Sequence, residues 1–401
     1  MQPRLDPATS LPADGTAGTL VGRAWVPGDP PGPSVVVLRG DEVVDVSAAF
    51  PTLAHLLNAE APAAQARAAA AQGQSLGTIG EVLANSAEPN RDPGRPWFLA
   101  PADLQALKAC GVTFAASLLE RVIEEQAEGD PAAAEAARQR IVAELGSDLS
   151  KVVPGSDEAA RLKALLQARG LWSQYLEVGI GPDAEVFTKG QPMSALGTGA
   201  VIGLHPDSRW SNPEPEAVLA VDARGECLGA TLGNDVNLRD FEGRSALLLG
   251  KSKDNNGSCA LGPFLRLFDG SFSLDDLRTA EIGLTVEGDD GFRLLGASSL
   301  ARISRDPLDL VAQTIGPVHQ YPDGLLLMTG TMFAPTEDRG APGEGFTHKP
   351  GDLVTIASPK LGALVNSVGL SDAIPPWTFG TAALMENLAA RGLLERGAEG
   401  L

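Results

Sequence analysis

Three acidic side chains near the middle of the chain have the types and spacing of a metal centre. Glu214 and Glu216 flank a proline directly before the apolar run 217–221. Residues two apart in a strand point to the same side, so these two carboxylates are expected to lie together. Asp235 follows nineteen residues after Glu216, where a returning strand would bring it beside the pair. Three converging carboxylates stay ionised only beside a cation, and oxygen ligands suit Mg²⁺ or Mn²⁺. The alternative is a set of solvated acids on an edge strand.

A lysine is the next candidate for chemistry. Lys253 lies in the polar segment GKSKDNNGSCALGP, and Lys251 precedes it by two residues. A lysine that is desolvated or close to a metal ion loses its proton more easily and can act as a base. The alternative is a surface lysine in a polar loop. The residue pattern alone leaves both interpretations open.

Hairpins and helices must position these side chains. The segments 217–233 and 283–296 are predicted β-hairpins, and 324–331 and 352–358 are predicted to contain further strands. Residues 102–175 are predicted to be mostly helical, with helices at 117–126, from Pro131 toward Gly146, and at 156–169. Arg239 and Asp240 are predicted to form an internal ion pair that holds the turn at Asp235.

The N-terminal part of the chain is predicted to contain different secondary structure. Residues 1–18 are predicted to be a loose tail, followed by short strands within 20–46 and a short helix at 52–57. A Pro-rich polar linker covers 85–96. The predicted division is therefore a small β-rich N-terminal domain, residues 1–97, and a larger catalytic domain, residues 98–401.

Composition excludes several classes of function. The chain has 401 residues, 43% hydrophobic content and a net charge of −20, which argues against binding to nucleic acid or to an anionic membrane surface. No apolar run of 18 residues and no secretory signal are evident. Three widely spaced cysteines match neither a disulfide framework nor a zinc site. A cytoplasmic location is the expectation.

Taken together, these motifs resemble the fumarylacetoacetate hydrolase superfamily. The resemblance rests on Glu214-x-Glu216, the segment GNDVNLRD at 233–240, Lys253 six residues before CALGP, and Thr329-Gly330-Thr331, in that order. It covers roughly residues 107–390. It implies an α+β fold, with a mixed β-roll catalytic domain preceded by the small β-rich N-terminal domain and accompanied by a helical block. It also implies a homodimer or homotetramer.

The resemblance assigns roles position by position. It implies that Glu214, Glu216 and Asp235 are ligands of Mg²⁺, with Mn²⁺ as the alternative, and that Lys253 is the active-site lysine. The resemblance further implies substrate contacts from Gly330, Thr331, Phe187 and Lys189. The substrate would be a small 2-oxo acid that chelates the metal through its carboxylate and keto oxygens.

One departure from the family pattern selects the reaction. Hydrolases of the family carry a histidine–glutamate dyad that activates water, but here Ser117 stands at the histidine position while Glu120 keeps the glutamate. Without an imidazole, hydrolysis loses its usual base, whereas a dehydration needs no added water. The segment resembles the sugar-acid dehydratase branch, which implies a hydro-lyase with Lys253, Glu120 and Ser117 as catalytic residues. Either Lys253 or Glu120 would remove the C3 proton.

Two other functions compete with the dehydratase. The first is a metal-dependent hydrolase of acylpyruvate-type 2-oxo acids, which would need a histidine from elsewhere in the chain. The second is a non-catalytic metal-binding protein on the same fold, which the complete set of three acids and a lysine disfavours.

Overall fold

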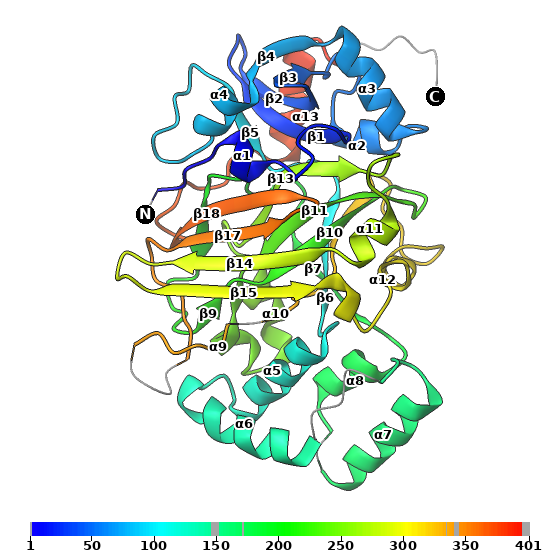
Figure 1. Cartoon of the computed structure of the whole chain (residues 1–401), viewed down its shortest axis with the longest axis vertical. Helices are drawn as coiled ribbons and strands as arrows, with labels where there is room; N and C mark the ends of the chain where they lie inside the picture. Colours follow the sequence, from blue (N-terminus) through cyan, green and yellow to red (C-terminus); the bar gives the residue numbers. More distant parts are fainter. Residues whose placement is uncertain (1, 146–151, 171, 334, 341–344, 395–401) are drawn as a thin grey trace.

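A computed structural model describes residues 2–145, 152–170, 172–333, 335–340 and 345–394. The molecule is elongated, with the N-terminal strands at one end, β-sheets in the middle and a block of helices at the other end (Figure 1). Among the described residues, no helix is both long and apolar enough to cross a membrane.

The largest sheet has eleven strands and runs from the N-terminal end of the molecule into its centre. Its order is β4-β3-β2-β1-β13-β11-β10-β16-β6-β7, and β5 pairs with β1 beside this path. Most neighbours are antiparallel, but β16 and β6 are parallel. The strands are β1 (Leu20–Val26), β2 (Gly32–Arg39), β3 (Glu42–Asp45), β4 (Gln74–Thr78), β5 (Trp97–Leu99), β6 (Ala106–Gly111), β7 (Glu185–Gly190), β10 (Pro215–Val221), β11 (Cys227–Asp235), β13 (Cys259–Leu267) and β16 (Leu325–Met328).

A second sheet of five strands packs against the centre of the first. Its order is β15-β14-β17-β18-β8, with β18 and β8 parallel. Its strands are β8 (Val201–Leu204), β14 (Glu281–Glu287), β15 (Arg293–Ser299), β17 (Leu353–Ser358) and β18 (Gly362–Leu370). Apolar side chains of both sheets, such as Leu219 and Ile356, form one buried core between them. The predicted hairpins β10–β11 and β14–β15 are confirmed.

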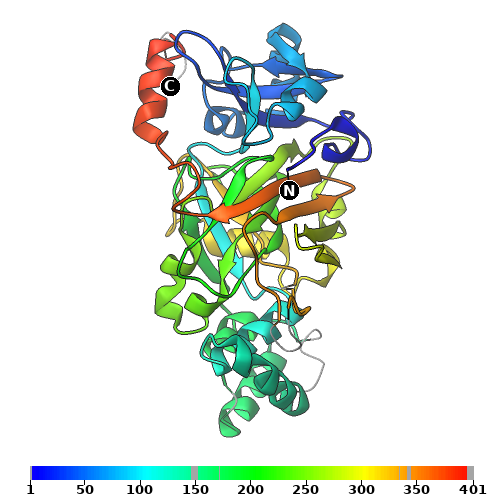
Figure 2. The ribbon, with the colours of Figure 1, turned by 90° about the vertical axis from the view of Figure 1, so that its left-hand side faces the viewer.

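The N-terminal strands and helices follow the sequence prediction, but the first residues do not. The strands β1 to β3 and the helix at residues 53–57 form where expected. The tail prediction is wrong, because Leu5 and Ser10 are buried and the amide of Ala13 donates to the carbonyl of Pro359. The C-terminal helix lies beside this part of the molecule (Figure 2). The helices of the N-terminal part are α1 (Pro7–Ser10), α2 (Leu53–Leu57), α3 (Pro62–Gln72) and α4 (Ile79–Ala84), and the C-terminal helix is α13 (Thr381–Ala390).

The domain boundary at residue 97 stays a prediction. Strand β5 begins at that residue and pairs with β1 of the N-terminal part. The N-terminal strands also join the rest of the sheet, where Leu20 and Val21 of β1 pair with Arg266 and Leu265 of β13.

The helical block forms one end of the molecule, and the short elements around the acidic residues lie next to it (Figure 1). The expectation that 102–175 is mostly helical misses β6, which becomes a central strand because it pairs with both β16 and β7. The predicted helix end at Gly146 lies outside the described residues. The helices of the block are α5 (Ala115–Gln126), α6 (Pro131–Leu145), α7 (Asp157–Ala168) and α8 (Gln174–Ile180). The short elements next to it are β9 (Ser211–Asn212), β12 (Asn237–Leu238), α9 (Arg239–Glu242), η2 (Ala246–Leu248) and α10 (Leu249–Lys253). Three further elements, α11 (Leu274–Arg278), η3 (Leu300–Arg302) and α12 (Pro307–Thr314), lie outside the block.

Candidate active site

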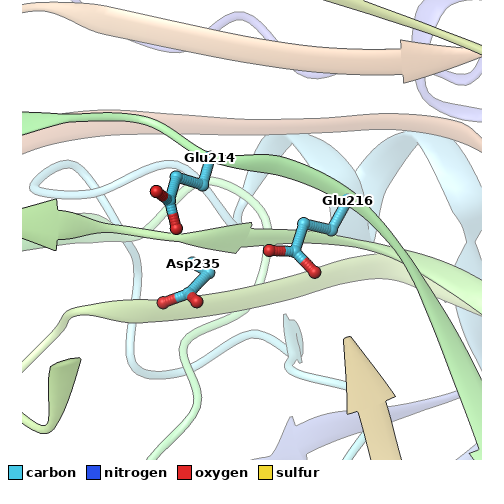
Figure 3. Close-up of side chains that lie close together, drawn as sticks. All are labelled: Glu214, Glu216 and Asp235. Carbon is cyan, nitrogen blue, oxygen red and sulfur yellow. The ribbon is translucent and has the colours of Figure 1, made fainter. Parts of the chain in front are cut away.

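The three predicted acidic residues come together where strands β10 and β11 pair. Glu216 lies opposite Gly233 in the antiparallel register, and the amide of Asp235 donates to the carbonyl of Glu214 over 3.1 Å. Glu214 and Glu216 point to the same side of their strand, and Asp235 faces them from the neighbouring strand (Figure 3). One oxygen of each carboxylate lies within 4.8 Å of the others, and all three side chains are buried.

Two buried lysines neutralise part of this negative charge. Lys253 Nζ donates to Glu214 Oε2 over 2.6 Å and to Asp235 Oδ2 over 3.0 Å. Lys189 Nζ lies 2.8 Å from Asp235 Oδ1 and donates to the carbonyls of Lys253 and Val236. Lys253 is thus part of the cluster, whereas the exposed Lys251 points its ammonium at the ring of Phe241.

The environment moves the acid pKa values in opposite directions. Burial, together with the charges of Asp235 and Glu214, raises the pKa of Glu216 well above its usual range. The pKa of Asp235 is lowered, because Lys189 and Lys253 more than offset its burial. Burial would lower the pKa of Lys253, but the facing carboxylates of Asp235 and Glu214 raise it instead. The protein therefore stabilises Asp235 as an anion more readily than Glu216.

A small cavity adjoins the cluster. None of the described residues that line it is a histidine, which agrees with Ser117 standing where family hydrolases have one. The lining residues are Cys110, Gly111, Val112, Ser117, Arg121, Glu185, Phe187, Glu214, Asp235, Glu242, Lys253 and Thr331. The lining thus combines acids, cations and the hydroxyls of Ser117 and Thr331 around a volume of about 10 Å³, which is room for about one water molecule.

The residues predicted to bind substrate occupy different positions. Thr331 and Phe187 line the cavity, and the Phe187 ring lies 5.5 Å from Lys253 Nζ. Gly330 instead supports a predicted metal ligand, because its amide donates to Glu216 Oε2 over 2.7 Å. Its φ of 99° also favours glycine, and a Cβ there would lie 2.1 Å from the hydroxyl of Thr113. Lys189 is fully buried behind Asp235 and is absent from the lining residues.

The two predicted catalytic residues on α5 are placed differently from each other. Ser117 lines the cavity, and its hydroxyl donates to the carbonyl of Phe114 over 3.0 Å. Glu120 is absent from the lining, because Arg138 and Arg239 hold its carboxylate as ion pairs. A catalytic role for Glu120 stays a prediction that this placement does not favour.

The predicted ion pair between Arg239 and Asp240 is wrong. Arg239 Nε instead donates to Glu124 over 2.6 Å, and Asp240 accepts from the hydroxyl of Ser208. Adjacent residues of the short helix α9 point in different directions, so they face different partners.

Sequence reasoning missed three charged residues that line the cavity: Arg121, Glu185 and Glu242. Glu185 precedes Phe187 by two residues on β7, so strand alternation placed it on the same face and was an available signal. Burial, aided by the charge of Glu242, raises the pKa of Glu185 to about 7. It is therefore the carboxyl group best suited to move a proton near neutral pH.

The raised pKa of Glu185 predicts a pH-dependent effect on stability. Ionisation in the folded, metal-free protein is disfavoured as pH rises from the ordinary pKa of 4.5 to about 7. Glu185→Gln removes this cost, so we expect it to stabilise the protein at pH 8 by about 3 kcal/mol. Below pH 4.5 the Glu185 carboxyl is mostly protonated in the folded and in the unfolded protein, so the gain should vanish. Urea unfolding in EDTA measures the free energy of unfolding of the variant and the parent protein at pH 8 and at pH 4.5. Equal gains at the two pH values would contradict the assigned pKa.

The donor set fits a hard divalent cation. The cluster offers one oxygen from each of three carboxylates, whereas zinc sites in proteins favour nitrogen and sulfur ligands. Glu214, Glu216 and Asp235 are therefore the residues that would hold Mg²⁺ or Mn²⁺.

The fold and the cluster define a class of domain. Residues 211–369 match the model of the fumarylacetoacetate (FAA) hydrolase C-terminal family, so this chain carries a domain of that family. The match contains all three acidic residues, Lys253 and Thr331. The expected α+β fold with a mixed β-roll is confirmed.

Individual relatives carry names of sugar-acid dehydratases. The chain is 32% identical over 184 residues to 2-dehydro-3-deoxy-D-arabinonate dehydratase of Saccharolobus solfataricus, covering 46% of this chain and 58% of the relative. It is 30% identical to a probable 2-keto-3-deoxyxylonate dehydratase of Haloferax volcanii, covering 48% and 63%. The matches thus span less than two thirds of either relative.

A solved structure with the same fold covers more of both chains. It is 2-keto-3-deoxy-D-arabinonate dehydratase complexed with magnesium and 2,5-dioxopentanoate, with a TM-score of 0.58 and 20% identity. The superposition covers 88% of this chain and 99% of the other. At this identity the likeness establishes the fold.

Proposed function

We propose that the protein is a magnesium-dependent hydro-lyase that converts 2-keto-3-deoxy-D-xylonate into 2-oxoglutarate semialdehyde and water, as a step of D-xylose degradation. The observation that carries this proposal is the buried group of Glu214, Glu216 and Asp235 with Lys253 2.6 Å from Glu214. The names of the two curated relatives support a dehydratase of this substrate class. The magnesium in the neighbour's complex supports the metal.

The choice of substrate depends on one stereocentre. The names of the relatives refer to acids derived from D-arabinose and D-xylose, whose C2 and C3 stereocentres are lost in the 2-keto-3-deoxy form. C4 is the stereocentre that remains, and it has the same configuration in both D-sugars. The proposal therefore predicts turnover of the acid with D configuration at C4.

The residues of the chain divide the reaction into charge stabilisation and proton transfer. A bound magnesium ion supplies a Lewis acid that polarises the 2-oxo group and acidifies the C3 protons. We assign the Lys253 ammonium to the oxygen that gains negative charge, because its raised pKa keeps it charged. Glu185 takes the C3 proton and returns one to the departing C4 hydroxyl, which leaves as water so that a C3=C4 double bond forms. Transfer of a C5 proton to C3, and then of the resulting enol hydroxyl proton to C4, gives the C5 aldehyde of 2-oxoglutarate semialdehyde. Ser117 and Thr331 orient the substrate hydroxyls and carboxylate.

A coupled assay tests the proposed function. The protein and Mg²⁺ receive 2-keto-3-deoxy-D-xylonate, and an NAD-dependent semialdehyde dehydrogenase reports the product. We expect NADH formation that EDTA abolishes and added Mg²⁺ restores, with the C4 epimer turned over more slowly. Acylpyruvates are offered in parallel, and release of pyruvate from them without semialdehyde from the sugar acid would overturn the proposal in favour of the hydrolase.

The remaining expectations about partners and location also stand as proposals. The family resemblance suits a homodimer or homotetramer, and the cytoplasm is the proposed location, with a small-molecule substrate and without nucleic acid or membrane. Light scattering of the purified protein would measure the oligomeric state.

A further inference from the structure

Arg121 on helix α5 is shared by three carboxylates. Its side chain is buried, and Nη1 donates to Glu124 Oε2 over 2.5 Å. Nη2 donates to Glu214 Oε1 and lies 3.5 Å from Glu242 Oε2. One guanidinium therefore links the helical block to the predicted metal ligand Glu214, which directly precedes β10.

Both oxygens of Glu214 have cationic partners in this arrangement. Arg121 contacts Oε1, and Lys253 Nζ lies 2.6 Å from Oε2. A metal ion bound by Glu214 must therefore share or replace one of these contacts. Glu216 differs, because its Oε2 accepts a hydrogen bond from the uncharged amide of Gly330.

The opposite side of Arg121 is firmly held. Glu124 also accepts from Arg239 Nε over 2.6 Å, and the guanidinium of Arg239 lies 4.3 Å from the ring centre of Trp210. Glu124 is almost fully buried, so its charge needs these two arginines. The network fixes the Arg121 guanidinium where it faces Glu214 and restricts its movement away from that carboxylate.

We propose that Arg121 is a positioning residue that orients Glu214 and competes with the divalent cation for that carboxylate. The inference rests on the proposed function to the extent that the cluster binds a cation. A fixed positive charge next to a dication raises the free energy of the bound state, so Arg121 lowers metal affinity while it holds Glu214 in place. Packing of α5 against the segment that carries Glu214 would thus set the metal affinity of the site.

Metal titration without substrate tests the proposal. Protein freed of metal with EDTA and then dialysed is titrated with Mg²⁺ alone, and separately with Mn²⁺ alone, by calorimetry. We expect Arg121→Gln to lower the dissociation constant at least about tenfold. Arg121→Lys keeps the positive charge and should remain closer to the parent protein. Arg138→Gln is the matched control, because Arg138 pairs with Glu120 instead of Glu214.

A double variant guards against loss of folding. Arg121→Gln leaves Glu124 with one arginine fewer, so Arg121→Gln/Glu124→Gln removes this pair together and still releases Glu214. Circular dichroism and thermal unfolding establish which variants are folded. Unchanged or weaker metal binding in a folded variant that lacks Arg121 would overturn the inference. Absence of metal binding in the parent protein would instead overturn the proposed metal-dependent function.

Discussion

Glu216→Gln should abolish metal-dependent turnover and weaken Mg²⁺ binding at least about 100-fold. Glu216 lies within the group of three carboxylates, and its backbone is fixed by pairing opposite Gly233. A glutamine fills the same space but offers no negative charge to the cation. The amide of Gly330, which donates to Glu216 Oε2, can donate to the glutamine oxygen instead, so the fold should persist.

The raised pKa of Glu216 adds a pH dependence to this prediction. Metal binding must ionise a carboxyl group whose pKa burial and neighbouring acids hold above its usual range, so binding should release a proton. Mg²⁺ affinity of the parent protein should therefore increase as pH rises. Glu216→Gln has no proton to release there and should lose that part of the dependence. Calorimetry in buffers of different ionisation enthalpy measures the number of protons released.

An exposed glutamate provides the control for charge and residue type. Glu281 begins strand β14 and is exposed to solvent. Glu281→Gln should leave the metal dissociation constant and the turnover number within about twofold of the parent protein. If Glu216→Gln still bound Mg²⁺ with parental affinity, Glu216 could not be a ligand and the cluster would need another interpretation.

Lys253→Met should lower kcat by about a thousandfold. The lysine is buried, touches both Glu214 and Asp235, and lines the cavity with Glu185. Methionine keeps much of the side-chain volume but removes the positive charge assigned to the developing anion. Metal binding should survive, because loss of a nearby cation makes the cluster more negative. Steady-state assays and Mg²⁺ titration of the same sample separate the two effects.

Lys251→Met is a matched control for this prediction. Lys251 lies on the same short helix, two residues earlier, but it is exposed and faces the ring of Phe241. We expect kcat and KM for this variant to stay within about twofold of parental values. Near-parental turnover by Lys253→Met, with Mg²⁺ bound, would remove the lysine from the proposed mechanism.

Local rules of the chain were enough to predict that the three acids lie together, whereas the family resemblance identified them as a metal centre. The two-residue repeat of a strand places Glu214 and Glu216 on one side, and the return of the hairpin brings Asp235 to them. Within the family resemblance, the spacing to the CALGP segment favoured Lys253 over Lys251, and the structure places Lys253 in contact with the acids. Strand β6 was missed because its partners β16 and β7 are distant in sequence, so no local pattern marked it.

The surroundings of the centre depend on packing between distant segments. The sequence of its own helix could not show whether Glu120 faces the cavity or an arginine. Its two partners lie on other helices, Arg239 on α9 and Arg138 on α6. Arg121 meets both Glu214 and Glu242 for the same reason, since long-range packing brings α5 and α9 to the residue that precedes β10. The chain's local periodicity thus specifies which acids share a strand face. The partners that hold or neutralise them, and hence their pKa values, follow from through-space contacts that periodicity does not encode.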